Sequence, residues 1–372
     1  MPLHIDLQQT EDLRDAVHRA VQALAEGKLV VLPTETVYGV AASALNERAV
    51  EQLKQLKTRE ASSPFALAVK SAEDALDYAP ALPPLAARIA RRCWPGPLTL
   101  VVDATHPDSV VHRLPPSVQS AVAPTGTVGL RVPADDFTLS VLRLIAGPLA
   151  LTSANLPGNE PATSGRDALR ELDDRVAIVV DAGSTRFAQN STVAQVDGDG
   201  LRVLREGVIT EAQMQRLSSF MVVLVCTGNT CRSPMAAGLM REQLAQRLTC
   251  QPSELEQRGV MVMSAGIAAM NGARASIEAV TTMSKLNIDI SDHESQPLTE
   301  RVVRFADLIL TMTRGHRDAI CAQWPEAAER VHLLCHDGRD VSDPIGGPES
   351  VYQQCATQIE AQLPDWIEQL DL

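Results

Sequence analysis

Apolar and polar positions alternate along the chain in two patterns, one typical of amphipathic helices and the other of buried strands. Between Leu13 and Leu24 the apolar residues recur at helical spacing and stop before Gly27, which predicts a helix with a glycine cap. Short apolar runs typical of buried strands follow. They occupy residues 29–32, 65–69, 98–102, 149–152, 176–180, 191–196 and 201–204. Proline and glycine separate many of these runs, so the first half is predicted to form a mixed, twisted sheet with functional loops.

The second half begins with a new buried run at residues 220–226, after a short amphipathic piece at 210–218. From there the predicted strands and helices alternate regularly, a pattern that favours a parallel sheet. Further strands are expected at 259–263, 307–312 and 331–334, and helices at 234–247, 272–285, 314–322 and 349–370. We therefore predict an α/β chain of two domains: residues 1–210 with a mixed sheet, and residues 220–372 with a parallel sheet.

The composition fits a globular protein of this size, since 372 residues exceed what one core usually needs. A net charge of -13 argues against a non-specific DNA or RNA coat, and 3% aromatic residues argue against base-stacking platforms. Seven cysteines without staple-like spacing indicate a reducing compartment. The opening MPLHIDLQQTEDLRD lacks a secretion signal, and no apolar run reaches membrane-spanning length. We expect a cytoplasmic protein that binds neither membrane nor DNA.

The segment CTGNTCRSP, residues 226–234, joins the buried run at 220–226 to the next predicted helix. Backbone N–H groups of such a loop and of the following helix N-terminus converge on an anion, and they favour a nucleophilic thiolate at Cys226. Arg232 offers a planar guanidinium that can hold two phosphate oxygens. The other residues expected to shape this phosphate loop are Thr227, Gly228, Asn229, Thr230, Cys231 and Ser233.

A leaving group needs a proton, and Asp343 can supply it from the Gly- and Pro-rich segment DPIGG at residues 343–347. Cys231 has two interpretations: a core thiol beside the loop, or a resolving partner that protects Cys226 through a reversible disulfide. The remaining cysteines lack catalytic or metal-ligand spacing, so no metal site is predicted.

Together with SAG at 264–266, FADLILTMT at 305–313 and Asp343-Pro344, this loop resembles the low-molecular-weight protein phosphatase family over residues 220–372. The resemblance implies that Cys226 is the nucleophile, Arg232 the phosphate binder and Asp343 the acid. It also implies a phosphoprotein substrate and no cofactor for this domain.

Within that family, Thr230 and the absence of aromatic residues just after Asp343-Pro344 look most like the protein-arginine phosphatase branch. Phosphoarginine is therefore favoured over phosphotyrosine, because a pocket without aromatic walls gains less from a phenol ring. An arsenate reductase coupled to thioredoxin shares the loop but needs a closer cysteine pair than Cys321 and Cys335.

The first half contains no Walker loop and no G-x-G-x-x-G, so a nucleotide there would need another cradle. Polar residues gather instead in motifs at predicted strand ends and turns. These are PTETVYG (33–39), WPGPLT (94–99), TVGLRVP (127–133), TSAN (152–155), NSTV (190–193) and LREG (204–207). Lys57 and Arg59 follow a helical stretch and would point the same way in an extended chain. Each motif alone fits a capped turn or a solvated helix end, but the set suits a polyanion and an amino-acid carboxylate.

This set resembles the YrdC-like threonylcarbamoyl-AMP synthase family over about residues 5–210. The resemblance implies an ATP site formed by Lys57, Arg59, Ser63, Thr127, Ser153, Asn155 and Arg205. It implies an L-threonine site formed by Thr34, Arg131, Thr152 and Ser191. The implied reaction carboxylates threonine with bicarbonate and adenylates the product from ATP, with Mg²⁺ bridging the phosphates. The product would then serve tRNA modification by partner proteins.

Four positions depart from that family's pattern: Glu60, Ala68, Asn190 and Glu206. The prediction is a bifunctional enzyme, a threonylcarbamoyl-AMP synthase joined to a cysteine-dependent phosphatase. The alternative makes the first domain a non-catalytic nucleotide- or RNA-binding module that regulates a low-molecular-weight protein-tyrosine phosphatase. A carbamoyl transfer domain related to hydrogenase maturation is disfavoured, because its neighbouring acylphosphatase and zinc-finger segments are missing.

Overall fold

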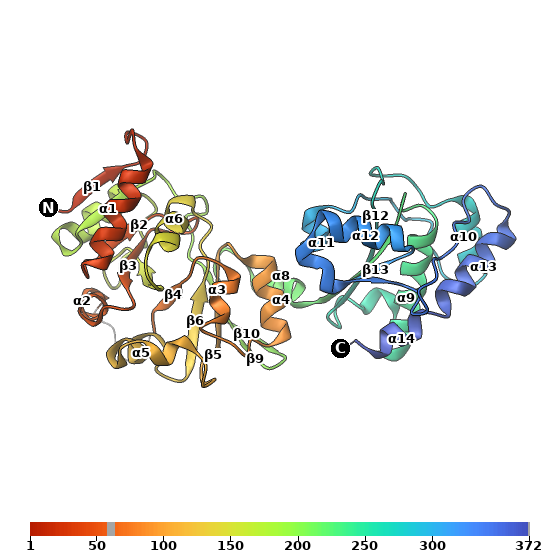
Figure 1. Ribbon diagram of the computed structural model, residues 1–372, viewed down its shortest axis with the longest axis horizontal. Coiled ribbons are helices and arrows are strands. Elements are labelled where there is room, and N and C mark those ends of the chain that lie inside the picture. The colour runs from red at the N-terminus through yellow and green to blue at the C-terminus, as the bar shows by residue number, and fades with distance from the viewer. Residues whose placement is uncertain (58–63, 371–372) are drawn as a thin grey trace. The chain divides into compact units, whose positions relative to one another are not determined.

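The computed structural model describes residues 1–57 and 64–370. The chain divides into two compact units, Met1–Met214 and Gln215–Leu372, drawn in red to green and in green to blue in Figure 1. Helix α8 (Glu211–Ser218), predicted as an amphipathic piece, spans the division. Among the described residues, no helix is both long enough and apolar enough to cross a bilayer.

The N-terminal unit is built on one mixed sheet, as predicted. Among the described residues, the sheet has ten strands in the order β1-β8-β2-β3-β7-β4-β6-β5-β9-β10, with parallel and antiparallel pairs. The strands are β1 (Leu3–Asp6), β2 (Val30–Leu32), β3 (Gly39–Ser43), β4 (Ala66–Ala68), β5 (Leu98–Asp103), β6 (Thr127–Arg131), β7 (Leu149–Ser153), β8 (Ile178–Asp181), β9 (Thr192–Asp197) and β10 (Gly200–Arg205). All seven apolar runs coincide with strands. Three of the described strands, β1, β3 and β6, have no such run; only Ile5 of β1 is buried, and β3 is made of small residues.

Helices connect these strands and cover the sheet. They are α1 (Leu13–Ala25), α2 (Glu47–Lys57), α3 (Ala72–Leu76), α4 (Pro84–Cys93), α5 (Pro116–Val122), α6 (Asp136–Leu144) and α7 (Gly165–Leu172), with 3₁₀ turns at Val110–Arg113 and Asp173–Arg175. Helix α1 matches its prediction: Asp12 caps its start, and Gly27 follows its end with φ +80°.

The C-terminal unit has an all-parallel sheet of order β12-β11-β13-β14 among the described residues, which confirms the predicted architecture. The strands are β11 (Phe220–Cys226), β12 (Val260–Gly266), β13 (Leu308–Thr311) and β14 (Val331–Leu333). The helices are α9 (Arg232–Arg247), α10 (Ile277–Ser284), α11 (Glu300–Phe305), α12 (Arg314–Gln323), α13 (Glu349–Glu360) and α14 (Leu363–Glu368), with 3₁₀ turns at Pro252–Glu254 and Pro325–Arg330.

Two helix predictions in this unit need correction. The helix expected over 349–370 is two helices, α13 and α14, with Pro364 in the first turn of the second. Proline is favoured there because it lacks an N–H that could continue the preceding helix. Helix α10 begins at Ile277 rather than 272, because Gly272 adopts φ +85° and Ser276 caps the helix.

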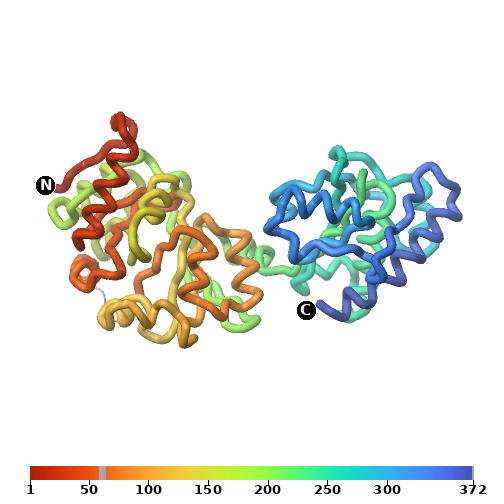
Figure 2. The backbone as a smooth tube through the Cα atoms, in the orientation of Figure 1, coloured from red at the N-terminus to blue at the C-terminus, as the bar shows by residue number. Residues whose placement is uncertain are grey.

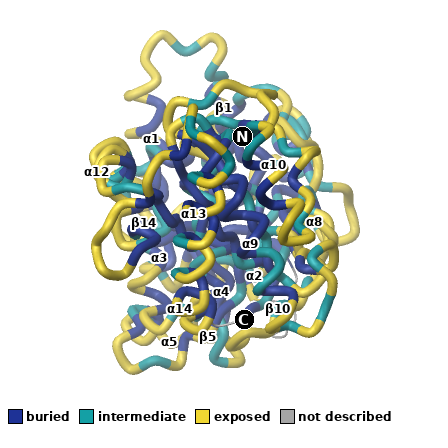
Figure 3. Tube along the Cα trace, turned by 90° about the vertical axis from the view of Figure 1, so that its right-hand side faces the viewer, coloured by how far each residue is buried: buried dark blue, intermediate teal, exposed yellow. Residues whose placement is uncertain are grey.

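Strand β11 is buried on both faces, and its alternation decides where Cys226 points. Val222, Leu224 and Cys226 join the core made with α9, α10, α13 and α14, whereas Val223 and Val225 join the core made with α11 and α12. Helices α9, α10 and α13 pack together on the first face (Figure 2). Helix α9 is buried along most of its length and is drawn largely in dark blue (Figure 3). The alternation therefore carries Cys226 to the side of the sheet that α9 covers.

A Cβ at Gly266, the last residue of β12, would lie 2.5 Å from the carbonyl oxygen of Thr227. We expect Gly266→Ala to lower the free energy of unfolding of the C-terminal unit by about 2 kcal/mol, because backbone must shift to admit the methyl group. Gly315→Ala is the control, since its Cβ would meet nothing nearer than 3.8 Å. Urea unfolding measures both, and equal stabilities of the two variants would contradict the expectation.

Candidate functional site

A cavity of about 670 Å³ opens on one face of the N-terminal sheet. Alternate residues of three strands line it, because alternate side chains of a strand share a face. They are Thr99 and Val101 of β5, Thr127, Gly129 and Arg131 of β6, and Val193 and Gln195 of β9. The residues predicted from the sequence that line it are Thr34, Thr127, Arg131, Thr152, Ser153, Ser191 and Arg205. The cavity lining therefore includes all four residues of the predicted threonine site and three of the seven of the predicted ATP site, over a sheet face as well as at strand ends.

The guanidinium of Arg131 is held by the segment that follows β2. Its Nη2 donates to Thr36 Oγ1 at 2.7 Å, to Glu35 Oε1 at 3.0 Å and to Thr34 Oγ1 at 3.4 Å. The other oxygen of Glu35 accepts from the N–H of Ala134 at 2.9 Å. The Nε of Arg131 is buried and has no hydrogen-bond partner among the described residues. Arg131 lines the cavity, and its guanidinium carries a permanent positive charge, so the cavity suits an anionic ligand.

A second guanidinium lies in the same cavity. Arg205 Nη2 donates to the carbonyl oxygen of Ser191 at 2.9 Å and to its Oγ at 3.3 Å. Arg205 is exposed as a whole residue, but its guanidinium is partly buried. This burial is the main cause that lowers the pKa of Arg205, and repulsion from the positive charge of Arg131 adds to it. A β-bulge between Val203 and Arg205 places the consecutive residues Leu204 and Arg205 on the cavity wall. An anion bound between the two guanidiniums would relieve their repulsion.

Lys57 is the last residue of α2 and is buried, so it ends the helix and does not follow it as predicted. Its Nζ donates to Asn155 O at 2.7 Å, to Asn155 Oδ1 at 2.9 Å and to Ser153 O at 3.1 Å. These bonds tie the helix end to the turn after β7, which brings Lys57 and Asn155 beside the cavity. An ammonium has three protons, so a phosphate that binds Lys57 must replace one of these acceptors. The predicted ATP ligands Arg59 and Ser63, and the departure at Glu60, lie outside the described residues.

The other departures from the family pattern have defined positions. Ala68 is buried in β4, and Asn190 lines the cavity. Glu206 accepts the N–H of Glu211 at 3.0 Å, at the start of α8. Its carboxylate therefore has a local partner outside the cavity lining.

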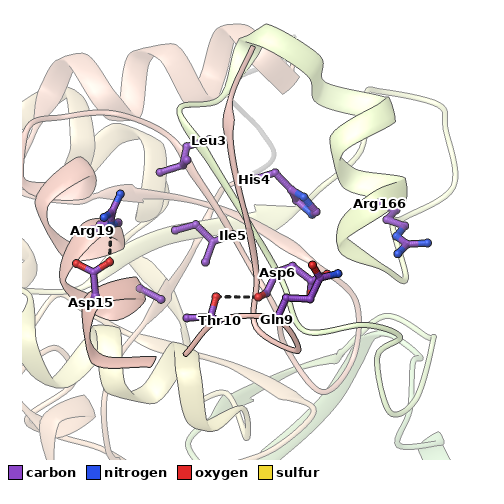
Figure 4. Close-up of a pocket in the computed structure, with 10 residues that line it drawn as sticks. Leu3, His4, Ile5, Asp6, Gln9, Thr10, Asp15, Arg19 and Arg166 are labelled. Atoms are coloured by element: carbon purple, nitrogen blue, oxygen red, sulfur yellow. Dashed lines mark hydrogen bonds and ion pairs between the residues drawn. The ribbon is translucent and has the colours of Figure 1, made fainter. Parts of the chain in front are cut away.

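A separate cavity of about 490 Å³ lies beside β1 and α1 and contains none of the predicted site residues (Figure 4). Two of its side chains contact acids: Arg19 contacts Asp15 at 2.6 Å, and His4 Nε2 lies 3.3 Å from Asp181 Oδ2. Among the described residues, no cluster of three or more His, Cys, Asp or Glu side chains is placed to hold a metal ion.

In the C-terminal unit, β11 ends at Cys226 and α9 begins at Arg232, so the intervening loop faces a helix N-terminus. The Sγ of Cys226 lies 3.0 Å from Ser233 Oγ and accepts from the backbone N–H of Asn229 at 3.2 Å. The sulfur therefore lies beside one backbone N–H and one hydroxyl, and its role as nucleophile stays a prediction.

Asn229 holds the loop in shape. Its φ of +56° is in the left-handed region, and its side chain donates to Ser233 Oγ at 2.9 Å and to Ser264 Oγ at 2.8 Å. Its Oδ1 accepts from the N–H of Gln296 at 2.9 Å, and its carbonyl oxygen lies 2.7 Å from His293 Nε2. A buried side chain with this many bonds leaves the loop little freedom.

The predicted phosphate binder and the predicted acid contact each other. Arg232 Nη2 donates to Asp343 Oδ2, and Nη1 donates to the carbonyl oxygen of Val341 at 3.3 Å. The Arg232 side chain is 6% exposed, whereas that of Asp343 is 44% exposed. The acid therefore lies at the open side of the guanidinium, where a substrate would enter.

The remaining loop residues are anchored to other elements. Thr227 Oγ1 lies 2.9 Å from His316 Nε2, and the carbonyl oxygen of Thr230 accepts from Ser276 N–H at 2.9 Å.

Cys231 is buried, with Sγ 3.5 Å from Ser276 Oγ and 3.6 Å from the hydroxyl of Tyr352. Burial raises the pKa of Tyr352 to about 12. No described cysteine is in a disulfide, and the redox role of Cys231 stays a prediction.

Sequence reasoning missed the residues that support both sites. Glu35 lies in the motif PTETVYG, between two threonines and directly after a buried strand. That position could have identified it from the sequence as a partner of a basic residue in the site. Gln296, His293 and His316 lie 64 to 89 residues from the loop residues they contact and have no local signal.

The sequence of residues 22–207 matches the family model described as Telomere recombination, which is named after Sua5, YciO and YrdC. Residues 221–372 match the model described as Low molecular weight phosphotyrosine protein phosphatase.

Individual relatives match one region each. A threonylcarbamoyl-AMP synthase of Pyrococcus abyssi is 34% identical over 194 residues, 52% of this chain and 54% of that protein. A protein-arginine-phosphatase of Geobacillus stearothermophilus is 35% identical over 156 residues, 41% of this chain and 96% of that protein. A solved structure of a P. abyssi Sua5 variant, 23% identical, has a similar fold with a TM-score of 0.53, over 71% of this chain and 91% of that one. The chain spans about half the length of the P. abyssi and Bacillus subtilis synthases that it matches.

Burial of His293 lowers its pKa below the ordinary value of 6.5, and the hydrogen bond to the Asn229 carbonyl only partly opposes this. The unfolded chain then binds the proton more tightly, so stability is present above about pH 6.5 and is lost as the pH falls towards the folded pKa. We expect His293→Gln to weaken this loss, measured as the difference in unfolding free energy between about pH 7.5 and pH 5.5. His336→Gln changes an exposed histidine and is the control. An unchanged pH dependence in His293→Gln would contradict the assignment.

Proposed function

Because the chain belongs to the Sua5/YciO/YrdC family over residues 22–207 and to the low-molecular-weight phosphatase family over residues 221–372, we propose that it is a bifunctional enzyme. Its N-terminal unit makes L-threonylcarbamoyl-AMP from L-threonine, bicarbonate and ATP. Its C-terminal unit is a cysteine-dependent protein phosphatase that prefers phosphoarginine to phosphotyrosine. The relatives named threonylcarbamoyl-AMP synthase and protein-arginine-phosphatase support these two assignments.

The observation that carries the phosphatase proposal is one loop that presents a hydrogen-bonded thiol and a guanidinium already paired with an acid. The Cys226 thiolate attacks phosphorus while Asp343 gives a proton to the departing atom. A water then cleaves the S–P bond as the Asp343 carboxylate takes its proton, which releases inorganic phosphate and restores the Cys226 thiolate and the protonated Asp343. Arg232 and the loop amides hold the phosphoryl oxygens in both steps.

The preference for phosphoarginine rests on the side chains that would surround the leaving group. Thr230 follows Asn229 in the loop, and Ile345, Gly346 and Gly347 follow Asp343-Pro344. This set offers no aromatic wall to a phenol ring, whereas a threonine hydroxyl can bond a guanidinium.

The observation that carries the synthase proposal is the cavity with two mutually repelling guanidiniums and a row of hydroxyl groups. Arg131, Thr34, Thr152 and Ser191 are proposed to hold L-threonine. Lys57, Thr127, Ser153, Asn155 and Arg205 are proposed to hold ATP, together with Arg59 and Ser63. The amine of threonine condenses with bicarbonate and loses water. The resulting carbamate oxygen attacks the α-phosphorus of ATP and expels pyrophosphate.

Mg²⁺ is proposed to enter with ATP. Because the described residues offer no acidic metal cluster, it would be held by phosphate oxygens and water. The product is proposed to pass to partner proteins that modify tRNA in the cytoplasm.

We expect Cys226→Ser to lose at least about 1,000-fold in kcat on p-nitrophenyl phosphate, because a serine hydroxyl is a far poorer nucleophile than a thiolate. Asp343→Asn should lose about 100-fold in kcat and still bind inorganic phosphate, because only the proton donor is removed. Steady-state kinetics with phosphate as a competitive inhibitor measures both. Full activity in Cys226→Ser would refute the covalent mechanism.

The proposed preference for phosphoarginine over phosphotyrosine rests on Thr230. Wild type should favour a phosphoarginine peptide over a phosphotyrosine peptide of the same sequence, and Thr230→Ile should reduce that kcat/KM ratio by about tenfold. Thr230→Ser keeps the hydroxyl and is the control. Equal ratios in wild type and Thr230→Ile would remove Thr230 from the argument.

Pyrophosphate release should require both L-threonine and bicarbonate. Arg131→Lys should raise the KM for threonine by about tenfold, because an ammonium cannot reproduce the forked guanidinium. Arg166→Lys, at an exposed arginine of the cavity in Figure 4, should leave it unchanged. ATP binding without any pyrophosphate release would favour the alternative, a nucleotide-binding module that regulates the phosphatase.

A further inference from the structure

The side chain of His316 links the phosphate loop to helix α12. Its Nε2 lies 2.9 Å from the hydroxyl of Thr227, the residue directly after Cys226. His316 is only 6% exposed, so this contact is shielded from water. The carbonyl oxygen of Thr227 accepts from the N–H of Ala268 at 3.0 Å. Thr227 is therefore held on two sides, by a side chain from α12 and by the backbone after β12.

The second ring nitrogen, Nδ1, is buried and has no hydrogen-bond partner among the described residues. In a neutral imidazole one nitrogen donates and the other accepts. A proton on Nδ1 would leave a buried N–H without an acceptor, and a charged ring would do the same. The proton therefore belongs on Nε2, which donates it to Thr227 Oγ1.

The surroundings of the ring also favour its neutral form. Burial is the main cause that lowers the pKa of His316, and the positive charge of Arg232 adds to it. Asp343 and Asp340 act in the opposite direction without reversing the result. His316 also lies in the first turn of α12, where the helix dipole disfavours a cation.

We propose that His316 is a positioning residue of the phosphatase site, whose neutral Nε2–H holds Thr227 and so fixes the loop amides around the phosphoryl group. The proposal rests on the proposed phosphatase function, but it concerns a residue outside the loop. Thr227 directly follows the nucleophile Cys226, and its backbone N–H is the first of the loop amides. A shift of Thr227 would therefore move these N–H donors relative to the sulfur of Cys226. A displacement of these donors weakens the binding of a phosphate dianion and of the transition state alike.

Kinetics with p-nitrophenyl phosphate test the proposal in the full chain. His316→Ala removes the donor, and we expect kcat/KM to fall about tenfold and the inhibition constant of inorganic phosphate to rise by a similar factor. His316→Asn keeps a neutral donor and should recover most of the loss. His336→Asn, at an exposed histidine of the same unit, should match wild type.

Nitrogen NMR of the wild-type protein labelled at histidine tests the same proposal where a variant fails to fold. The expected spectrum shows a neutral His316 ring with its proton on Nε2 at about pH 6.5, and inorganic phosphate should perturb it. A proton on Nδ1 or a charged ring at that pH would overturn the proposal. So would a folded His316→Ala whose kinetics and phosphate affinity match wild type, or equal losses in His316→Ala and His316→Asn.

The two proposals fail in different ways. A wild-type chain that binds phosphate but does not turn over p-nitrophenyl phosphate would refute the proposed function. The ring tautomer and the phosphate affinity of the variants would still decide the role of His316.

Discussion

Buried hydrogen-bonding groups need partners, and two of the few described side-chain atoms that lack one belong to residues of the two sites. Arg131 Nε is unpaired on the wall of the N-terminal cavity, and His316 Nδ1 is unpaired beside the phosphate loop. The two cases differ in chemistry. The Arg131 guanidinium keeps its positive charge whether or not Nε is paired, so it attracts an anion, whereas an unused imidazole nitrogen fixes a tautomer. The permanent charge therefore points to a ligand in one unit, and the tautomer to a positioning contact in the other.

The two units are both α/β folds, yet they place their chemistry differently. In the C-terminal unit every strand is parallel, so the polar loops gather beyond the strand ends, and the loop after β11 meets the N-terminus of α9. In the N-terminal unit the cavity lies over a face of the mixed sheet, and alternate residues of β5, β6 and β9 line it. Gly129 helps to open that lining, because it contributes no side chain between Thr127 and Arg131.

The arginine side chains of the two sites also differ in how far nearby carboxylates neutralise them. The positive charge of Arg232 already has a carboxylate partner in Asp343, so a phosphate competes for an occupied guanidinium. The Nη2 of Arg131 contacts Glu35 and two threonines, while Arg205 bonds only neutral oxygens of Ser191 among the described contacts. Among the described residues, one guanidinium of the N-terminal cavity thus has no carboxylate partner, whereas that of Arg232 has one.

The sequence by itself determined the elements whose signals are local. Continuous apolar runs marked β11 and most of the other buried strands, although not β3. Cys226 to Ser233 lie within one loop and helix start, so their contact needs no distant segment. The break between α13 and α14 was missed because apolar spacing continues through it, although Pro364 was visible. Only the tertiary structure decided that His316, His293 and Gln296 brace the phosphate loop, and that Lys57 is bound by Ser153 and Asn155 across 96 and 98 residues. Such partners depend on which strands and helices become neighbours, and a pattern with periods of two or 3.6 residues carries no information about that choice.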